Sequence, residues 1–239
     1  MILAIDCGNS RVKWGLHQDG GWRGIGTVPV AELARAQKRW MRIVATDKVV
    51  IANVAGPSMR RRLEGFFARR SVAPIWVVAK RRECGVTNGY VKPEQLGVDR
   101  WAALIGAWSI LRAPCLVVTA GTATTVDVLR GDGTFAGGAI LPGLDLMKRS
   151  LADNTAGLPL AKGRFSNEPR NTADAIETGC LLAQAGAIER AFATMEHGAV
   201  CVLAGGAASR IARHLGVPLR LVDNLVLEGL IRIAEAGRK

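Results

Sequence analysis

The sequence predicts a mixed α/β protein made of two similar lobes. Short apolar, β-branched segments alternate with segments whose apolar residues recur every three or four positions, which is typical of strands and helices in covered sheets. Two distant segments, ILAIDCGNSRVKWGL (2–16) and CLVVTAGTATTVDVL (115–129), also share one plan: strand, glycine-containing turn, strand. This duplication predicts one lobe over residues 1–112 and another over residues 113–239.

In the first lobe, runs of apolar and β-branched residues predict the strands, and the three-and-four spacing of apolar residues predicts the helices. The expected strands are ILAID (2–6), RVKWGLH (11–17), KVVIANV (48–54) and PIWVVA (74–79). The expected helices cover residues 30–41, 58–71 and 98–112.

The second lobe follows the same logic. Its expected strands are CLVVTAG (115–121), TTVDVL (124–129), AVCVLAGGA (199–207) and LRLVD (219–223), and its expected helices cover residues 171–195 and 208–215. The glycines of GGAILPG (137–143) are expected to shape a turn after the strand 124–129 and to let backbone approach a ligand. Gly205 and Gly206 lie where a predicted strand enters a predicted helix.

Composition indicates an ordered globular protein without a membrane span. Of 239 residues, 49% are hydrophobic, and no apolar stretch reaches the roughly 18 residues that a membrane helix needs. No signal peptide is expected, because Asp6 interrupts the first apolar run. The five cysteines are odd in number and lack a CxxC pair, which favours reduced thiols in the cytoplasm over disulfides or a metal site.

The formal charge of +12 raises the question of an anionic partner. Its densest part is the segment 58–71, where Leu63, Phe66 and Phe67 share one predicted helix face and arginines surround them. We interpret this segment as a solvated amphipathic helix. The alternative is a basic patch that steers anionic ligands, since no nucleic-acid-binding motif accompanies it.

The first glycine turn has the residues of a phosphate site. Asp6 ends a buried strand, where a carboxylate is costly unless it meets a cation such as the Mg²⁺ carried by ATP. Gly8 permits close approach, Asn9 and Ser10 offer donors, and Lys13 can reach phosphate oxygens. The alternative is a plain hairpin with a solvent-facing Asp6.

The second glycine turn lacks an acid but is rich in hydroxyl groups. Gly121, Thr122, Thr124 and Thr125 place donors between two strands without adding charge. With one hairpin in each half, the sequence predicts two lobes facing a nucleotide cleft, in which both hairpins hold one triphosphate.

Six ordered motifs carry a family resemblance. They are DCGNSRVK (6–13), NGYVKPEQLGVDR (88–100), GTATT (121–125), GGAILPGLDLM (137–147), NTADAIETG (171–179) and LAGGAA (203–208). With these motifs the chain resembles the type III pantothenate kinases, which include proteins called Bvg accessory factors, within the acetate kinase, sugar kinase, Hsp70 and actin superfamily. The resemblance covers almost the whole chain and implies two actin-like (ribonuclease H-like) lobes, each a mixed sheet flanked by helices.

The resemblance also implies an activity: ATP-dependent phosphorylation of pantothenate to 4′-phosphopantothenate, the first step of coenzyme A biosynthesis, in a cytoplasmic homodimer. It implies the following roles: Asp99 as general base; Asp6, Gly8, Asn9, Ser10, Lys13, Gly121, Thr122, Gly205 and Gly206 for ATP, with Asp6 also at Mg²⁺; Tyr90, Gly97, Val98, Arg100 and Thr172 for pantothenate. In related dimers the residue matching Thr172 acts across the subunit interface.

The chemistry of the residues agrees with these roles. A primary alcohol does not ionise alone at neutral pH, so a positioned proton acceptor is needed, and Asp99 can supply it. Arg100 would then be free to pair with the carboxylate of pantothenate. The alternative for Asp99 is a structural one, the N-cap of the helix that starts in VDRWAALIGAW.

The chain departs from the family pattern at Thr119. Many relatives have Asp there, which helps to hold a monovalent cation such as K⁺ or NH₄⁺, and a hydroxyl coordinates an ion more weakly. The ion site is therefore altered or absent, or it persists through other oxygens. Two other functions remain open: another small-molecule kinase of the superfamily, and a nucleic-acid-binding regulator, although no specific nucleic acid is expected.

Overall fold

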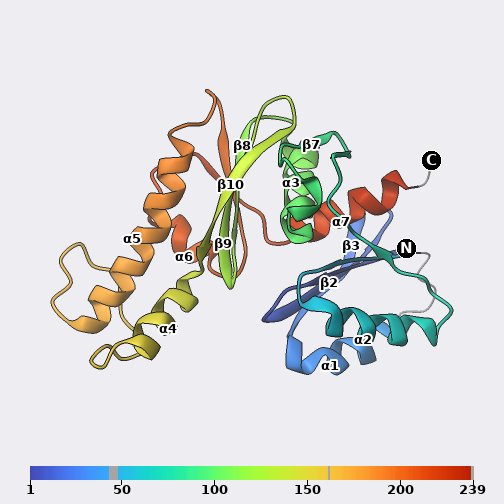
Figure 1. Ribbon diagram of the computed structural model, residues 1–239, viewed down its shortest axis with the longest axis horizontal. Coiled ribbons are helices and arrows are strands. Elements are labelled where there is room, and N and C mark those ends of the chain that lie inside the picture. Colours follow the sequence, from blue (N-terminus) through green and yellow to red (C-terminus); the bar gives the residue numbers. More distant parts are fainter. Residues whose placement is uncertain (43–47, 161, 238–239) are drawn as a thin grey trace. The chain divides into compact units, whose positions relative to one another are not determined.

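The computed structural model describes residues 1–42, 48–160 and 162–237, and its chain divides into two compact units (Figure 1). The first unit comprises residues 1–112, 133–135 and 224–239, and the second comprises residues 113–132 and 136–223. The first unit thus includes two segments that the sequence analysis assigned to the second lobe: Gly133–Phe135 and the C-terminal helix α7 (Leu225–Ala236).

The first unit is built on a five-stranded sheet in the order β3-β2-β1-β4-β5. Its strands are β1 (Ile2–Cys7), β2 (Arg11–Gln18), β3 (Gly21–Pro29), β4 (Lys48–Asn53) and the two-residue β5 (Ile75–Trp76). The central strand β1 runs antiparallel to β2 and parallel to β4. Asp6 is therefore near the end of a strand that has neighbours on both sides.

Helices cover both faces of this sheet (Figure 1). On one face, α1 (Leu33–Trp40) and α2 (Gly56–Ala68) bury Leu33, Leu63 and Phe67 against β-strand residues such as Ile5 and Ile51. The short 3₁₀ helix η1 (Val30–Glu32) leads into α1. On the other face lie α3 (Val98–Leu111) and α7, which contact β4 and β1.

Helices α3 and α7 pack against each other at unusually short range because two glycines leave room. A methyl group added at Gly229 would lie 1.8 Å from the carbonyl oxygen of Ala102, and one added at Gly106 would lie 2.4 Å from that of Leu225. Both distances are far shorter than any real contact of a methyl carbon. The C-terminal helix thereby fixes the position of α3, the helix that starts at the GVDR motif.

A small strand pair precedes α3 in the first unit. Strands β6 (Arg82–Glu83) and β7 (Val86–Asn88) are antiparallel, and their turn has left-handed backbone at Cys84 and Gly85. Thr134 and Phe135, the first residues of β10, pair in parallel with β7. The 3₁₀ helix η2 (Pro93–Gln95) then connects β7 to α3.

The second unit contains five strands in the order β12-β11-β8-β9-β10. They are β8 (Cys115–Ala120), β9 (Ala123–Leu129), β10 (Thr134–Pro142), β11 (Val200–Ala204) and β12 (Leu219–Leu221). Helices α4 (Leu144–Asn154), α5 (Thr172–Phe192) and α6 (Ala208–Ala212) pack on one face of this sheet (Figure 1). Leu116, Val118 and Val126 meet Ile176 and Leu181 in that core.

The two units repeat one strand order, which confirms the predicted pair of similar lobes. In each, an antiparallel hairpin (β1-β2 or β8-β9) is extended on one side by a third strand, and on the other by two parallel strands. The two predicted glycine turns occupy equivalent places, between the first and second strands of each sheet.

Several elements differ from the sequence predictions. Strands β3 and β10 and helices α4 and α7 were not predicted, and the predicted strand 74–79 is reduced to β5. The expectation of a turn at GGAILPG is wrong: residues 137–142 belong to β10, and only Gly143 lies outside it, as the N-cap of α4. The cysteines agree with prediction, since all five are free.

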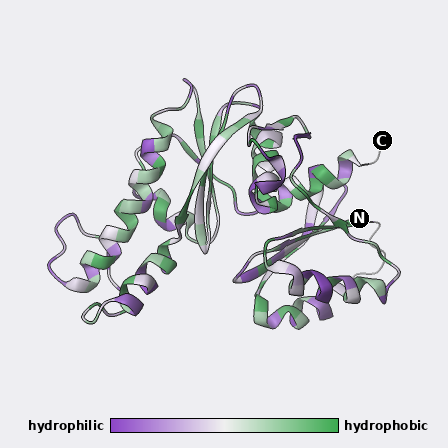
Figure 2. Ribbon diagram, viewed as in Figure 1, coloured by the Kyte–Doolittle hydropathy of each residue, from purple (hydrophilic) through white to green (hydrophobic). Residues whose placement is uncertain are grey.

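Charge is divided unequally between the units. The first unit holds 22 of the 32 Lys and Arg residues but only 10 of the 20 Asp and Glu residues, so it carries the entire excess of +12. Figure 2 shows the hydrophilic stretch of α2 that contributes to it. As predicted, Leu63 and Phe67 are buried on the apolar side of α2 and Phe66 packs against the same core while partly buried; Met59 is buried there as well.

Among the described residues, no helix is both long enough and apolar enough to cross a membrane.

Replacement of Gly229 by Ala tests the close packing of α3 and α7. We expect Gly229→Ala to lower the unfolding free energy by at least about 2 kcal/mol, because the helices must separate, and to lower the Tm by roughly 4–8 °C. Thermal unfolding followed by circular dichroism measures the effect. The matched control is Gly65→Ala in α2, where an added methyl meets no atom within 4 Å. It should stabilise by about 0.5–1 kcal/mol, so equal effects at both positions would contradict this account.

Candidate functional site

The tip of the first hairpin is exposed and consists of small residues. The N–H of Gly8 donates to the carbonyl of Arg11 at 3.0 Å, which closes the turn around Asn9 and Ser10. Both of these residues are exposed. A methyl group at Gly8 would lie 3.2 Å from the carbonyl oxygen of Arg11, so a larger residue would crowd the turn. The tip therefore presents small polar groups, as the sequence predicted.

Asp6, Lys13 and Asp99 interact electrostatically within the first unit. Asp6 is half-buried and faces Lys13 across the β1-β2 pair in register. Burial and then the negative charge of Asp99 raise the pKa of the Asp6 carboxyl to about 7, while the charge of Lys13 acts in the opposite direction. Two acids and one lysine make a site that a bound cation would stabilise, because a cation favours the ionised form of Asp6.

Asp99 lies in the first turn of α3, but it is not the N-cap. Gly97 occupies the cap position, and no side chain caps the helix. Asp99 is half-buried, and its Oδ1 accepts a hydrogen bond from the N–H of Arg100 at 2.8 Å. A methyl group at Gly97 would lie 2.8 Å from that oxygen. Gly97 thus makes room for the carboxylate, and the capping alternative for Asp99 does not describe this helix.

Arg100 is buried and already has a partner. Its side chain is only 5% exposed, and its Nη1 donates to the hydroxyl of Tyr90 at 3.0 Å. The guanidinium also lies over the rings of Tyr90 and Phe135, 5.6 and 5.7 Å from their centres. The Arg100 guanidinium therefore already has one partner in Tyr90, and two predicted substrate residues, Tyr90 and Arg100, come together. Val98, also predicted, is the first residue of α3.

Two residues that the sequence analysis gave no role hold the loop carrying Tyr90. Asn88 is fully buried; its Oδ1 accepts from the N–H of Tyr90 and its Nδ2 donates to the carbonyl of Pro93. Arg81 donates to the carbonyls of Asn88 and Tyr90, each at 2.9 Å. Asn88 stands in the quoted motif NGYVKPEQLGVDR, whereas no pattern marked Arg81.

The second hairpin exposes fewer hydroxyls than predicted. The N–H of Gly121 donates to the carbonyl of Ala123 at 3.0 Å, and Gly121 and Thr122 are exposed at the tip. Thr124 and Thr125 instead belong to β9 and are buried. Their hydroxyls, and that of Thr119, find no hydrogen-bond partner among the described residues. Only Thr122 therefore remains a tip hydroxyl.

Two glycine junctions pack against this second tip. The N–H of Gly143 donates to the carbonyl of Thr122 at 2.9 Å, and a methyl group there would lie 2.1 Å from the carbonyl oxygen of Gly121. Gly205 has a φ of +103°, and a methyl group there would lie 2.3 Å from the carbonyl oxygen of Ala120. Backbone packing thus requires Gly205, whereas Gly206 is exposed in open space.

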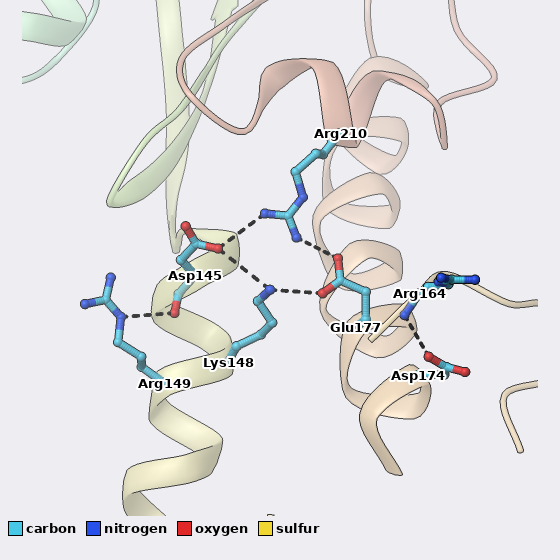
Figure 3. A network of polar contacts seen from close by, with 7 residues as sticks. All are labelled: Asp145, Lys148, Arg149, Arg164, Asp174, Glu177 and Arg210. Carbon is cyan, nitrogen blue, oxygen red and sulfur yellow. Dashed lines mark hydrogen bonds and ion pairs between the residues drawn. The ribbon is translucent and has the colours of Figure 1, made fainter. Parts of the chain in front are cut away.

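A network of four charged side chains joins α4, α5 and α6 (Figure 3). Glu177 accepts from Lys148 at 2.9 Å on one oxygen and from Arg210 at 2.6 Å on the other. Asp145 lies 3.3 Å from Arg210 and 3.8 Å from Lys148. Burial opposes ionisation of Glu177, but the hydrogen bonds from Lys148 and Arg210 outweigh it and lower the pKa of this carboxyl.

Thr172, the remaining predicted residue, is exposed at the start of α5 in the second unit. The preceding Asn171 caps this helix, since its side-chain oxygen accepts from the N–H of Asp174 at 2.9 Å. No group of three or more His, Cys, Asp or Glu side chains within residues 1–42, 48–160 and 162–237 could hold a metal ion by itself. Any metal at Asp6 would therefore need further ligands, such as oxygens of a bound phosphate or of water.

Comparison with known proteins gives one consistent result. A sequence profile described as type III pantothenate kinase matches residues 2–194. The type III pantothenate kinase of Aromatoleum aromaticum is 51% identical over 236 residues, which cover 98% of each chain.

Two solved structures share the fold. One is a Campylobacter jejuni protein assigned to the Baf family of transcriptional activators, with 19% identity, a TM-score of 0.68 and 98% of each chain covered. The other is a Sinorhizobium meliloti protein assigned as a 2-dehydro-3-deoxygalactonokinase, with 15% identity and a TM-score of 0.62, covering 100% of this chain and 99% of that one. The profile match and the high identity over nearly the whole length show that this chain belongs to the type III pantothenate kinase family.

Proposed function

We propose that this chain transfers the γ-phosphoryl group of ATP to the primary hydroxyl of pantothenate, forming 4′-phosphopantothenate for coenzyme A biosynthesis. Membership of the family supports the reaction. The main structural support for this reaction is the group of Asp6, Lys13 and Asp99 in the first unit. Two carboxylates and one lysine lie there beside an exposed glycine tip. The five free thiols support a cytoplasmic site of action.

Asp99 is the proposed general base. Its Oδ1 accepts the backbone N–H of Arg100 at 2.8 Å, and we assign its second oxygen, Oδ2, to the substrate hydroxyl. As the alcohol attacks phosphorus, Asp99 would take its proton, and Arg100 and Tyr90 would orient the pantoyl end of the substrate together with Gly97, Val98 and Thr172. Because Arg100 already binds Tyr90, we assign these two side chains one joint role in substrate binding.

The hairpin tips are the proposed phosphate-binding elements. Gly8, Asn9, Ser10 and Lys13 in the first unit, and Gly121 and Thr122 in the second, offer backbone N–H groups, hydroxyls and one cation. Gly205 and Gly206 are assigned to the nucleoside. Asp6 would hold Mg²⁺, and the bound metal would neutralise charge on the phosphoryl oxygens. The raised pKa of Asp6 supports this assignment, since the site lacks a full positive counter-charge.

A homodimer is part of the proposal. In the second unit, β9, β10 and α5 line a cavity of about 510 Å³, with Val128, Gly138, Ala139 and Leu141 among its walls. Ile140 of β10 and Leu182 of α5 are 63% and 54% exposed. An apolar surface of this kind supports association with a second copy, which would cover it.

Asp99→Asn tests the general base. We expect kcat to fall by about 10² to 10⁴, with little change in the KM for ATP, because the amide keeps the shape but cannot accept the proton. Formation of ADP and phosphopantothenate from Mg-ATP and pantothenate measures the rate. Glu94→Gln, which removes an exposed carboxylate in the same motif, should act like the parent. A parent without pantothenate kinase activity would contradict the proposed function, and an Asp99→Asn variant as fast as the parent would contradict only the base.

Asp6→Asn tests the cation site through pH. Because the folded-state pKa of Asp6 lies near 7, above the ordinary 3.8, its ionisation destabilises the ligand-free protein progressively between pH 4 and 7. We expect the Asn variant to gain stability relative to the parent over this range, by at most about 4 kcal/mol, and to bind Mg-ATP more weakly. Denaturant unfolding at several pH values measures the difference. A difference that stays constant with pH would show that Asp6 does not titrate there.

Thr119→Asp tests the altered ion site. Thr119 and Thr125 pair in register across β8 and β9, and their buried hydroxyls have no hydrogen-bond partner among the described residues, so they fit as two neutral oxygen ligands for K⁺ or NH₄⁺. Restoring the carboxylate should lower the half-saturating K⁺ concentration by about tenfold and make the Tm more sensitive to K⁺. Titration of KCl against choline chloride at constant ionic strength measures both. Parent and variant responding alike would exclude a cation at this position.

A further inference from the structure

The four-charge network lies immediately behind the second hairpin tip, not in a remote part of the fold. Asp145 and Lys148 belong to the first turns of α4, and Arg210 is the third residue of α6. Each of these helices begins at a glycine junction that packs on the tip, Gly143 for α4 and Gly205 for α6. The network therefore connects the starting turns of two helices whose starts contact the tip.

Short hydrogen-bonded paths lead from the tip to the network. On one side, the carbonyl of Ala120 accepts from the N–H of Ala207, whose carbonyl accepts from the N–H of Arg210, each at 3.1 Å. On the other side, the carbonyl of Thr122 accepts from the N–H of Gly143, whose carbonyl accepts from the N–H of Met147 at 2.9 Å. Met147 directly precedes Lys148. The first path thus ends at Arg210 and the second next to Lys148, and the side chains of both of these cationic residues bind Glu177.

Helix α5 contacts both of these hydrogen-bonded paths. Glu177 has a side chain only 8% exposed, and each of its oxygens binds one cation. Seven residues further along α5, the fully buried Gln184 donates to the carbonyl of Pro142 at 2.8 Å, just before Gly143. Helix α5 thus holds the start of α4 through the Gln184–Pro142 hydrogen bond and the Glu177–Lys148 ion pair. It holds the start of α6 through the Glu177–Arg210 ion pair.

We propose that Glu177 is a positioning residue for nucleotide binding. By holding Lys148 and Arg210 together, it fixes the Gly143 and Gly205 junctions and so keeps the Gly121-Thr122 tip in the shape that binds phosphate. This inference deepens the proposed function and rests on it for the role of the tip. Glu177 does not touch the nucleotide in this account.

The physics of buried ion pairs favours a positioning role over a purely stabilising one. Desolvation cancels much of the Coulomb attraction of a buried pair, so such pairs are weak evidence for stability, but loss of one partner leaves the others uncompensated. Without the charge of Glu177, only the carboxylate of Asp145 would offset the Lys148 ammonium and the Arg210 guanidinium, so the repulsion between these two cations would be only partly compensated. The repulsion would move the starts of α4 and α6 apart, and the junctions with them.

The test compares Arg210→Gln with Arg213→Gln. The two variants make the same charge change one turn apart, but Arg213 is exposed and makes no ion pair among the described residues. We expect Arg210→Gln to raise the KM for Mg-ATP and the Kd for Mg-ADP about tenfold, with the KM for pantothenate unchanged. Arg213→Gln should match the parent. Glu177→Gln should weaken nucleotide binding further, and the surface position of Arg210, 42% exposed, keeps the test valid if Glu177→Gln does not fold.

Two other outcomes would decide against the inference. Variants that lose only thermal stability, with Mg-ADP binding by calorimetry like that of the parent, would make the network merely structural. An equal rise in the KM for pantothenate would indicate general loosening of the fold. Because Mg-ADP binding needs no pantothenate, a parent that binds Mg-ADP without phosphorylating pantothenate would overturn the proposed function and leave the inference testable.

Discussion

The burial of Asp6 close to a second acid, Asp99, is the constraint on which the site in the first unit depends. The fold brings together two acids that would avoid each other in a flexible chain: β1 holds one between two neighbouring strands, and the first turn of α3 holds the other. The position of α3 in turn depends on α7, since Gly106 and Gly229 let the two backbones touch. The last helix of the chain thus supports a carboxylate near its middle, and the raised pKa of Asp6 records the cost of that arrangement.

The second unit repeats the strand order of the first, but its hairpin tip is held in place by different contacts. Its tip carries no acid, and its shape comes from backbone contacts with Gly143 and Gly205 and from helices held by ion pairs. A tip that is held by backbone contacts relies on the elements packed around it. This difference explains why the charged network belongs to this unit, whereas in the first unit the N–H of Val30 donates to the carbonyl of Ser10 at the tip.

Sequence patterns predicted the parts of the fold that are locally encoded. The strands of both hairpins, the amphipathic α2 and the long α5 followed from apolar spacing, and the glycine tips followed from their residues. Strand β10 was not predicted because two adjacent glycines usually favour a turn. Of the site, the meeting of Tyr90 and Arg100 and the network joining residues 145, 148, 177 and 210 depend on tertiary packing, so no local pattern could reveal them. The buried hydroxyls of Thr124 and Thr125 show the same limit: a strand was predicted there, but not which residues its neighbours would cover.

The uneven division of charge between the units affects how fast the reactants bind and how fast the product leaves. One half of the chain is strongly cationic and the other is formally neutral, so the protein has a polarised long-range field that draws polyanions toward its first unit. Both proposed reactants are anions, and phosphorylation adds further negative charge to the acceptor. The field that hastens arrival therefore also holds the product back, and counter-ions in the surrounding solution set the balance between capture and escape.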